Sequence, residues 1–218
     1  MKINGADAAN FGVIRYRADG TAELTLAEAS YAEHGRGARI GYAIAESEFG
    51  HLLIAATAVG LCWVGVEESA ARLTREFRDD FRNAELLADD DRARRYAPRV
   101  IASARGATAP IELALDLRAT PFQLAVWREL CAIPRGATRS YGEIARRMGN
   151  ASAARAVGRA NGSNPLAIVI PCHRAIGAGG ALTGYRWGVE YKRRLLAHER
   201  AIAQADLPLA AARAAGAG

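Results

Sequence analysis

The segment Cys172-His173-Arg174 holds the residue types best suited to nucleophilic chemistry in this sequence. The thiolate, not the thiol, is the nucleophilic form of cysteine, and a neighbouring proton acceptor or positive charge raises its share. We therefore expect His173 and Arg174 to lower the pKa of the Cys172 thiol. Cys62 and Cys131 are interpreted instead as small buried side chains. Three cysteines at these spacings predict neither a disulfide framework nor a zinc site.

Two arginines one helical turn apart, Arg155 and Arg159, form a second pattern that could bind a ligand. They share one face of a helix expected over residues 153–160, where nearly every other residue is Ala, Gly or Val. Small side chains allow close approach of the backbone, and two arginines on that surface can meet phosphates or a groove. A helix hairpin that packs through alanine and leaves its arginines in solvent would produce the same pattern.

Two capping motifs position helices ahead of that segment. Thr120-Pro121-Phe122-Gln123 and Ser140-Tyr141-Gly142-Glu143 each place Gln or Glu three residues after an N-cap hydroxyl. The second helix is expected to stop at Gly149, and Ser152 to cap the next one. Together these signals predict a helix-turn-helix whose second helix covers residues 153–160.

An apolar run, residues 166–170, leads directly to the candidate nucleophile. It follows Asn164-Pro165 and is closed by Pro171. We interpret it as a short, buried, extended segment that holds Cys172 in a fixed place.

The first half of the chain predicts a small unit of strands and helices over residues 39–118. Leu73, Phe77 and Phe81 repeat every four residues, which places them on one face of a helix that could cover a sheet. Residues 1–38 are left unassigned, apart from a short strand around residues 11–14. Strands are expected at 40–44, 50–57, 61–64 and 111–117, a second helix at 97–104, and a solvated loop at 89–91.

Charge is unevenly distributed along the chain. Residues 119–200 hold 13 Arg or Lys against four Asp or Glu, a net charge of +9, so the rest carries −3 of the total of +6. This asymmetry favours a polyanionic partner for the second half, although arginine-rich surfaces in general would produce it too. No apolar run approaches the length of a membrane span, and the first residues lack the apolar core of a secretory signal. We therefore expect no membrane contact and a cytoplasmic location.

The segment Ile170-Pro171-Cys172-His173-Arg174 resembles the active-site signature of the O6-alkylguanine-DNA alkyltransferases, also called methylated-DNA-protein-cysteine methyltransferases. The resemblance covers roughly residues 39–202 and is strongest after residue 119. Further blocks in the family's order make it far more specific than one short motif. They are Thr120-Pro121-Phe122-Gln123, Ser140-Tyr141-Gly142-Glu143, Arg155-Ala156-Val157-Gly158, Asn164-Pro165, Gly184-Tyr185-Arg186-Trp187-Gly188 and Leu195-Leu196-Ala197-His198-Glu199.

This resemblance implies an α+β fold in two domains. A small antiparallel sheet with helices, a ribonuclease-H-like unit, would form the N-terminal domain over residues 39–118. A mainly helical, winged helix-turn-helix-like domain over residues 119–203 would bind DNA and transfer the alkyl group. Residues 1–38 would be an N-terminal extension and residues 204–218 an Ala-rich tail, whose order the sequence does not decide.

The implied reaction is DNA repair by stoichiometric, irreversible alkyl transfer. Cys172 would accept the alkyl group of O6-alkylguanine, and of O4-alkylthymine, in duplex DNA. His173 would act with a bound water as its base, oriented by Glu199, in the manner of a Cys-His-acid relay. Asn164 would brace the segment that holds the cysteine.

Base recognition is implied for another group of residues. Tyr141 would donate a hydrogen bond or a proton to the departing guanine and line the base pocket with Tyr185 and Gly184. Arg155 would enter the base stack when the target nucleotide turns out, on a helix docked in the minor groove. The residues implied to complete the DNA-binding surface are Arg159, Ala154 and Ser140.

The resemblance implies no cofactor, no metal and a monomer acting on double-stranded DNA. Some relatives carry a zinc-binding regulatory domain, but residues 1–38 contain no cysteine, so no such site is expected. Ala175 and the glycine-rich residues 177–180 depart from the family pattern, which leaves the range of accepted alkyl groups open.

Three other functions fit parts of the pattern. A lesion-binding module without chemistry would resemble this region, but alkyltransferase-like proteins of that kind replace the acceptor cysteine, which is present as Cys172. A thiol hydrolase could use Cys172 and His173, although adjacent residues give such a pair poor geometry. A sequence-specific regulator would use the helix-turn-helix alone, yet residues 153–160 offer few side chains for reading base edges.

Overall fold

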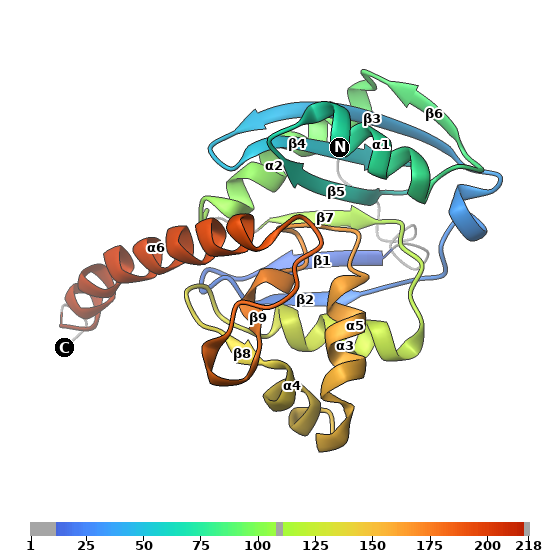
Figure 1. The fold of residues 1–218 in the computed structure, drawn as a ribbon. Helices are drawn as coiled ribbons and strands as arrows, with labels where there is room; N and C mark the ends of the chain where they lie inside the picture. The colour runs from blue at the N-terminus through green and yellow to red at the C-terminus, as the bar shows by residue number, and fades with distance from the viewer. Residues whose placement is uncertain (1–11, 108–110, 216–218) are drawn as a thin grey trace.

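The computed structural model describes residues 12–107 and 111–215, and within them seven strands form one large sheet (Figure 1). A body of helices from the second half of the chain lies beneath it. The strands are β1 (Gly12–Tyr16), β2 (Ala22–Thr25), β3 (Arg39–Ser47), β4 (Gly50–Ala56), β5 (Leu61–Glu67), β6 (Glu85–Ala88) and β7 (Glu112–Leu115). Their order across the sheet is β2-β1-β7-β5-β4-β3-β6.

The sheet is mixed, so the expectation of an antiparallel sheet is wrong. The hairpins β3–β4 and β4–β5 are antiparallel, but β6 pairs parallel to β3, and β5 parallel to β7. A parallel pair needs a crossover connection, often a helix. Helix α1 (Ala70–Asp80), which lies between β5 and β6 in the chain, is part of the connection from β3 to β6 and of the connection from β5 to β7.

Residues 12–25, in which the sequence predicted only a short strand around residues 11–14, belong to the same sheet. β1 pairs antiparallel with β2 on one side and with β7 on the other. The sheet therefore includes strands that precede residue 39. The expected strand around residues 11–14 is present from Gly12 onward, and Phe11 lies outside the described residues.

Two helices pack on this sheet, α1 on β4 and β5, and α2 (Asp91–Ala104) on β3 and β4. As predicted, Leu73, Phe77 and Phe81 are the buried face that α1 presents. Helix α2 begins earlier than the predicted residue 97 because Asp90 caps it, accepting from the backbone N–H groups of the second and third helical residues. The expected solvated loop at 89–91 is thus partly a helix start.

The second half is mainly helical, with α3 (Pro121–Cys131), α4 (Tyr141–Arg147), α5 (Ala154–Gly162) and α6 (Val189–Ala215), and a two-stranded parallel pair, β8 (Arg139–Ser140) and β9 (Ala175–Ile176). Both predicted capping boxes are confirmed, at Thr120 and Ser140. The predicted cap at Ser152 is wrong. Its hydroxyl donates to the Asn150 side chain at 2.8 Å, and a 3₁₀ turn, Ala151–Ala153, leads into α5.

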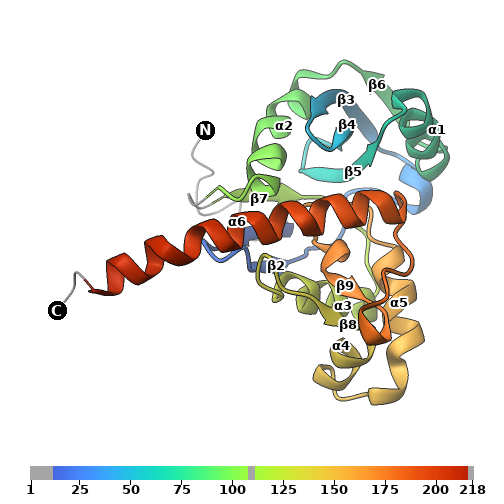
Figure 2. The same ribbon diagram turned by 60° about the vertical axis from the view of Figure 1, so that its left-hand side comes forward.

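Helix α6 crosses the molecule and then runs past it as a single helix (Figure 2). The Ala-rich segment that begins at residue 204 continues this helix as far as Ala215, so in this structure the tail is helical up to that point. Among the helices of the described residues, none is both long enough and apolar enough to cross a membrane.

We predict that Phe77→Ala lowers the free energy of unfolding by about 4 kcal/mol, because the ring is fully buried against those of Tyr42, Trp63 and Phe81 and its loss leaves a cavity. Urea unfolding measures this. Ile44→Ala is the control, since Ile44 is 40% exposed, and should cost much less. Equal losses in the two variants would contradict the assigned core.

Candidate active site

The residues that lead to Cys172 form a tight turn. The extended segment expected from the apolar run, residues 166–170, is therefore wrong. The start of the run forms one isolated bridge to β5, in which Leu166 lies beside Val64 and the backbone of Pro165 and Ala167 makes the hydrogen bonds. The chain then turns, with the Ile170 amide donating to the Leu166 carbonyl at 3.0 Å and Ile168 in the left-handed region at φ 69°. The run is nonetheless buried throughout, and Cys172 starts a 3₁₀ helix, Cys172–Arg174.

Asn164 ties this turn to the sulfur. Its side-chain Nδ2 lies 3.1 Å from the Leu166 carbonyl, 2.9 Å from the Ile170 carbonyl and 3.1 Å from Cys172 Sγ, while its Oδ1 accepts from the Leu166 amide at 3.0 Å. The side chain is fully buried. One amide therefore fixes both ends of the turn and offers an N–H to the nucleophile.

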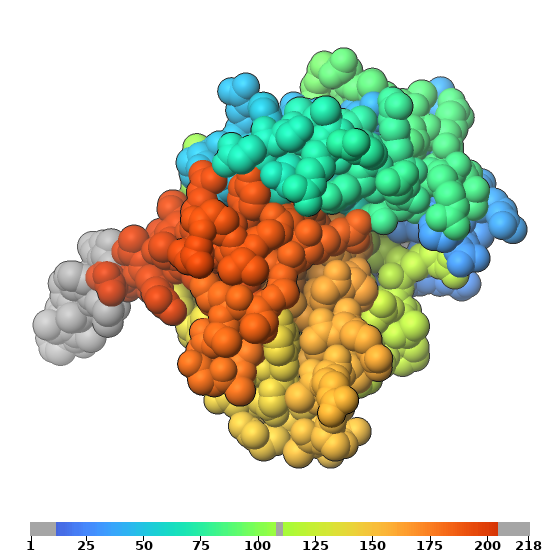
Figure 3. All heavy atoms as spheres, in the orientation of Figure 1, coloured from blue at the N-terminus to red at the C-terminus, as the bar shows by residue number. Residues whose placement is uncertain are grey.

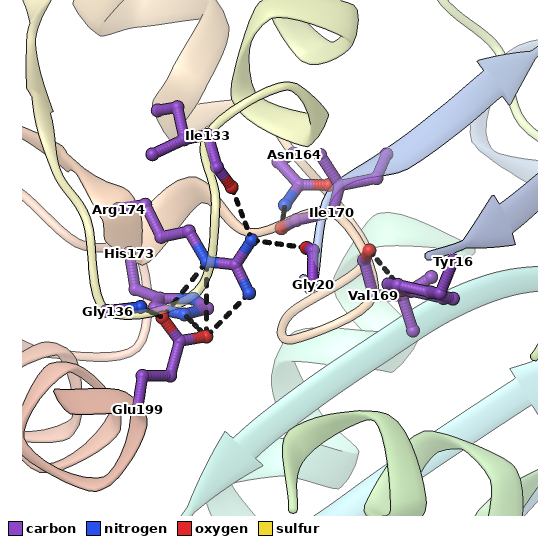
Figure 4. A network of polar contacts seen from close by, with 10 residues as sticks. All are labelled: Tyr16, Gly20, Ile133, Gly136, Asn164, Val169, Ile170, His173, Arg174 and Glu199. Atoms are coloured by element: carbon purple, nitrogen blue, oxygen red, sulfur yellow. Dashed lines mark hydrogen bonds and ion pairs between the residues drawn. The ribbon is translucent and has the colours of Figure 1, made fainter. Parts of the chain in front are cut away.

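The residue after the cysteine, His173, forms a buried pair with Glu199 (Figure 4). The His173 Nε2 lies 2.9 Å from Glu199 Oε1, across from α6 to the 3₁₀ helix. In the neutral imidazole, a proton on Nε2 leaves Nδ1 with its lone pair free to accept. That Nδ1 is buried and has no hydrogen-bond partner among the described residues. The arrangement can take a proton from a group next to Nδ1.

Arg174 completes this cluster and was not assigned a role there from the sequence. Its guanidinium contacts both Glu199 oxygens at 2.8 to 3.1 Å, and its Nη1 donates to the carbonyls of Gly20 and Ile133, each at 2.7 Å. Burial alone would raise the pKa of Glu199, but His173 and Arg174 lower it far below its usual value. Glu199 is thus held as a carboxylate. The five N–H donors of arginine suit such a buried fork.

The expected lowering of the thiol pKa is wrong for this structure. Burial raises the pKa of Cys172 to about 11, and the opposing effects of Asn164, Lys192 and Arg186 only reduce the rise. Arg174 points to Glu199 and so gives the sulfur little help. Cys172 is therefore a neutral thiol at rest, and its chemistry requires a base.

Near the sulfur also lie Tyr141, Tyr185 and Lys192, since Cys172 acts on the pKa of each of them. The Tyr141 hydroxyl donates to the Thr183 carbonyl at 3.2 Å, and the Lys192 ammonium donates to the same carbonyl at 3.1 Å and lies 5.8 Å from the Tyr141 ring centre. Burial raises the pKa of Tyr185, and so do the proximity of Cys172 and the side-chain hydrogen bond with it.

Lys192 was missed from the sequence, although it is completely buried. Burial lowers its pKa, and the proximity of Cys172 opposes that. It also donates toward the Gly184 carbonyl at 3.4 Å, so it positions the segment that holds Tyr185. Nothing in the local pattern distinguishes it from the solvated arginines that follow it on α6.

The predicted DNA-binding residues lie on one side of the second half. Ser140, Tyr141, Ala154 and Arg155 line a single open groove between α4, α5 and residues 176–180. Arg159 lines a different, shallower hollow beside Phe122 and Gln123. In Figure 3 the orange-red part of the chain lies between the teal and green first half and the yellow and amber helices.

Comparison with known proteins agrees with this site. Residues 121–201 match the family model of the 6-O-methylguanine DNA methyltransferase DNA-binding domain. An inducible methylated-DNA-protein-cysteine methyltransferase of Bacillus subtilis is 42% identical over 157 residues, 71% of this chain and 88% of that protein. The crystal structure of Mycobacterium tuberculosis OGT in complex with DNA superposes with a TM-score of 0.61 at 40% identity, covering 74% of this chain and 93% of that one.

This chain belongs to the methylated-DNA-protein-cysteine methyltransferase family. It also resembles the Escherichia coli bifunctional transcriptional activator and DNA repair enzyme Ada, at 38% identity over 183 residues. That match covers 84% of this chain but only 51% of Ada, so the chain spans about half the length of that relative. Among the described residues no cluster of His, Cys, Asp and Glu could hold a metal ion.

We predict that Glu199→Gln lowers the free energy of unfolding by about 3 kcal/mol at neutral pH, because it leaves the buried Arg174 without its carboxylate. The folded-state pKa of Glu199 is lowered, so its contribution is complete above the unfolded value of about 4.3 and is lost as the pH falls below it. The difference between wild type and variant should shrink below that pH.

Urea unfolding across a pH series measures this, with Glu190→Gln as the control, since Glu190 pairs with Arg193 on the exposed side of the same helix. That variant should differ little from wild type at any pH. A Glu199→Gln protein as stable as wild type, or a difference that grows on acidification, would contradict the assigned ion pair.

Proposed function

We propose that this protein repairs DNA by moving the alkyl group of O6-alkylguanine, and of O4-alkylthymine, from duplex DNA onto Cys172 in one irreversible turnover. The single observation that supports it most is the cysteine held by Asn164 beside a buried His173–Glu199 pair. The family of the chain supports the same reaction, because relatives such as the Bacillus subtilis protein are named for it.

In the proposed reaction His173 Nδ1, through a bound water, takes the proton of the Cys172 thiol. Glu199 stabilises the imidazolium that forms. The thiolate attacks the alkyl carbon, a carbon–sulfur bond forms, and the bond from that carbon to guanine O6 breaks with its electron pair leaving on the base. Tyr141 donates a proton to the departing guanine. The proton lost by the thiol makes up for the one that Tyr141 gives to the base, so the reaction has no net gain or loss of protons. The thioether has no route back to a thiol, so the turnover is single.

A neutral resting thiol with a pKa of about 11 needs this assistance. The Asn164 amide N–H and the Lys192 ammonium both favour negative charge on the sulfur, so they would stabilise the thiolate as it forms. The Tyr185 hydroxyl and the Gly184 backbone would line the base pocket, where the hydroxyl would meet the polar edge of the purine, and the proximity of Tyr185 to Cys172 supports this role.

We further propose that the groove between α4 and α5 receives DNA, with Arg155 filling the stack where a base has turned out. Turning a base out costs a few kcal/mol, least for a damaged pair. Exposed Arg155 and the alanines around it support this placement. Ser140 and Ala154 line the same groove, while Arg159 would contact backbone phosphate further along α5.

The finer description of the molecule belongs to this proposal as well. The first half, to residue 118, would be a ribonuclease-H-like domain, and residues 119–203 a winged helix-turn-helix-like domain in which the β8–β9 pair stands beside α4. One chain holds all the proposed catalytic residues, so a monomer would suffice. A reaction on DNA with a free thiol suits the reducing cytoplasm.

We predict that wild-type protein incubated with duplex DNA containing O6-methylguanine gains the mass of one methyl group, located on Cys172 by peptide mass spectrometry. Cys172→Ala should bind the DNA and gain nothing, while Cys131→Ala should still gain one methyl. Binding without any gain by the wild type would instead make the protein a lesion-binding module. A methyl on Cys62 or Cys131, or repeated turnover, would also contradict the mechanism.

We predict that Arg155→Ala slows methyl transfer from duplex DNA by about tenfold or more. The reason is that the side chain which fills the gap in the base stack is lost, and filling this gap offsets part of the few kcal/mol that turning the base out costs. Transfer from the free base O6-methylguanine should change by less than about twofold, since no base needs turning out. Single-turnover rate constants measure both, with Arg159→Ala for comparison. Equal losses on the two substrates would remove this role of Arg155.

A further inference from the structure

We infer that the hairpin formed by β1 and β2 positions the active site from behind, through the Tyr16 hydroxyl and the Gly20 carbonyl. The inference rests on the proposed alkyl transfer and adds positioning residues to it. The hairpin comes from residues 12–25, far in sequence from the family-model match at residues 121–201. Figure 4 shows both of its contacts with the cysteine turn and the arginine behind it.

The first contact holds the cysteine turn. The Tyr16 hydroxyl donates a hydrogen bond to the backbone carbonyl of Val169. Val169 follows Ile168, whose left-handed backbone is costly for a β-branched residue and persists only where its surroundings hold it. Burial raises the pKa of Tyr16, so its hydroxyl remains a donor throughout the usual pH range. Three residues after Val169 comes the sulfur.

The second contact holds the arginine of the relay. The Gly20 carbonyl accepts from Arg174 Nη1 at 2.7 Å, while Nη2 of the same guanidinium donates to Glu199. Gly20 has φ of 75°, and a Cβ there would lie 2.7 Å from Cβ of Arg135, so the turn tolerates no side chain. Hairpin, Arg174, Glu199 and His173 therefore form one continuous chain of contacts.

Two more bonds dock the hairpin on the second half of the protein. The Asp19 carbonyl accepts from the Arg135 amide at 2.9 Å, and the Leu24 carbonyl from Arg128 Nε at 3.1 Å. These two hydrogen bonds, to α3 and to the loop that follows it, fix the hairpin while β1 remains paired with β7 in the sheet. The hairpin ties the sheet to the site, so its Tyr16 acts on the geometry of Cys172 without touching the substrate.

The test is Tyr16→Phe, which removes one hydroxyl and keeps the ring. Tyr31→Phe is the matched control, because the Tyr31 hydroxyl also donates to a backbone carbonyl, that of Asp116 at 3.1 Å, within the first half of the protein. Each variant loses one hydrogen bond, so both should unfold at similarly lowered urea concentrations. Single-turnover methyl transfer at saturating DNA, and the Kd for the same DNA, are then measured for both.

We expect Tyr16→Phe to lower the rate constant about tenfold with an unchanged Kd, as for a group that fixes only reacting geometry. Tyr31→Phe should transfer at the wild-type rate. Equal rates in Tyr16→Phe and wild type, or equal slowing in both variants, would overturn the inference while leaving the proposed function intact. A wild-type protein that accepts no methyl would remove the proposed function, and this inference with it.

Discussion

The buried carboxylate of Glu199 is the interaction on which the rest of the site depends. A charge in the interior costs several kcal/mol unless it is paired and hydrogen-bonded. Here the Arg174 guanidinium and the His173 Nε2 both contact the carboxylate, and the Gly136 amide lies 3.4 Å from it. Since Glu199 lies on α6 and its partners on other segments, the ion pair can form only when α6, the 3₁₀ helix and the loop after α3 meet. The same meeting sets the tautomer of His173 and frees its Nδ1.

The burial of the site also keeps the Cys172 thiol neutral in the resting protein. Deep burial beside Tyr185 and the cysteine turn keeps the pKa of Cys172 near 11. A neutral, buried thiol reacts slowly with oxidants and stray electrophiles. For a protein proposed to act once, this protects the nucleophile until a base occupies the pocket. Activation is then left to the neighbouring relay, with Asn164 and Lys192 stabilising the negative sulfur.

Features set by neighbours in sequence were predictable, and those set by tertiary contacts were not. The caps at Thr120 and Ser140 and the buried face of α1 follow from spacings of three and four residues, and they are confirmed. Of residues 12–25 only the start of β1 was predicted as a strand, because their place in the sheet depends on pairing with β7, about a hundred residues away.

The site shows the same division. The family resemblance named the cysteine, its histidine and its asparagine, and the structure brings them together. It could not show that Arg174 would turn toward Glu199 and away from the sulfur, because Glu199 approaches from α6. For that reason the sign of the cysteine pKa shift was wrong: the sequence shows the buried run and the adjacent charges, but not that burial outweighs those charges at the sulfur.

The ionisation of Cys172 in the free protein tests this account most directly. Thiolates absorb in the ultraviolet more strongly than thiols, so a pH titration of wild type minus Cys172→Ser isolates this sulfur. The other two thiols, Cys131 with its pKa raised to about 12 and Cys62 with its pKa raised by burial, are present in both proteins and should cancel in the difference. The account predicts no thiolate signal near neutral pH and a rise only toward pH 11. A full signal already present at neutral pH would contradict it.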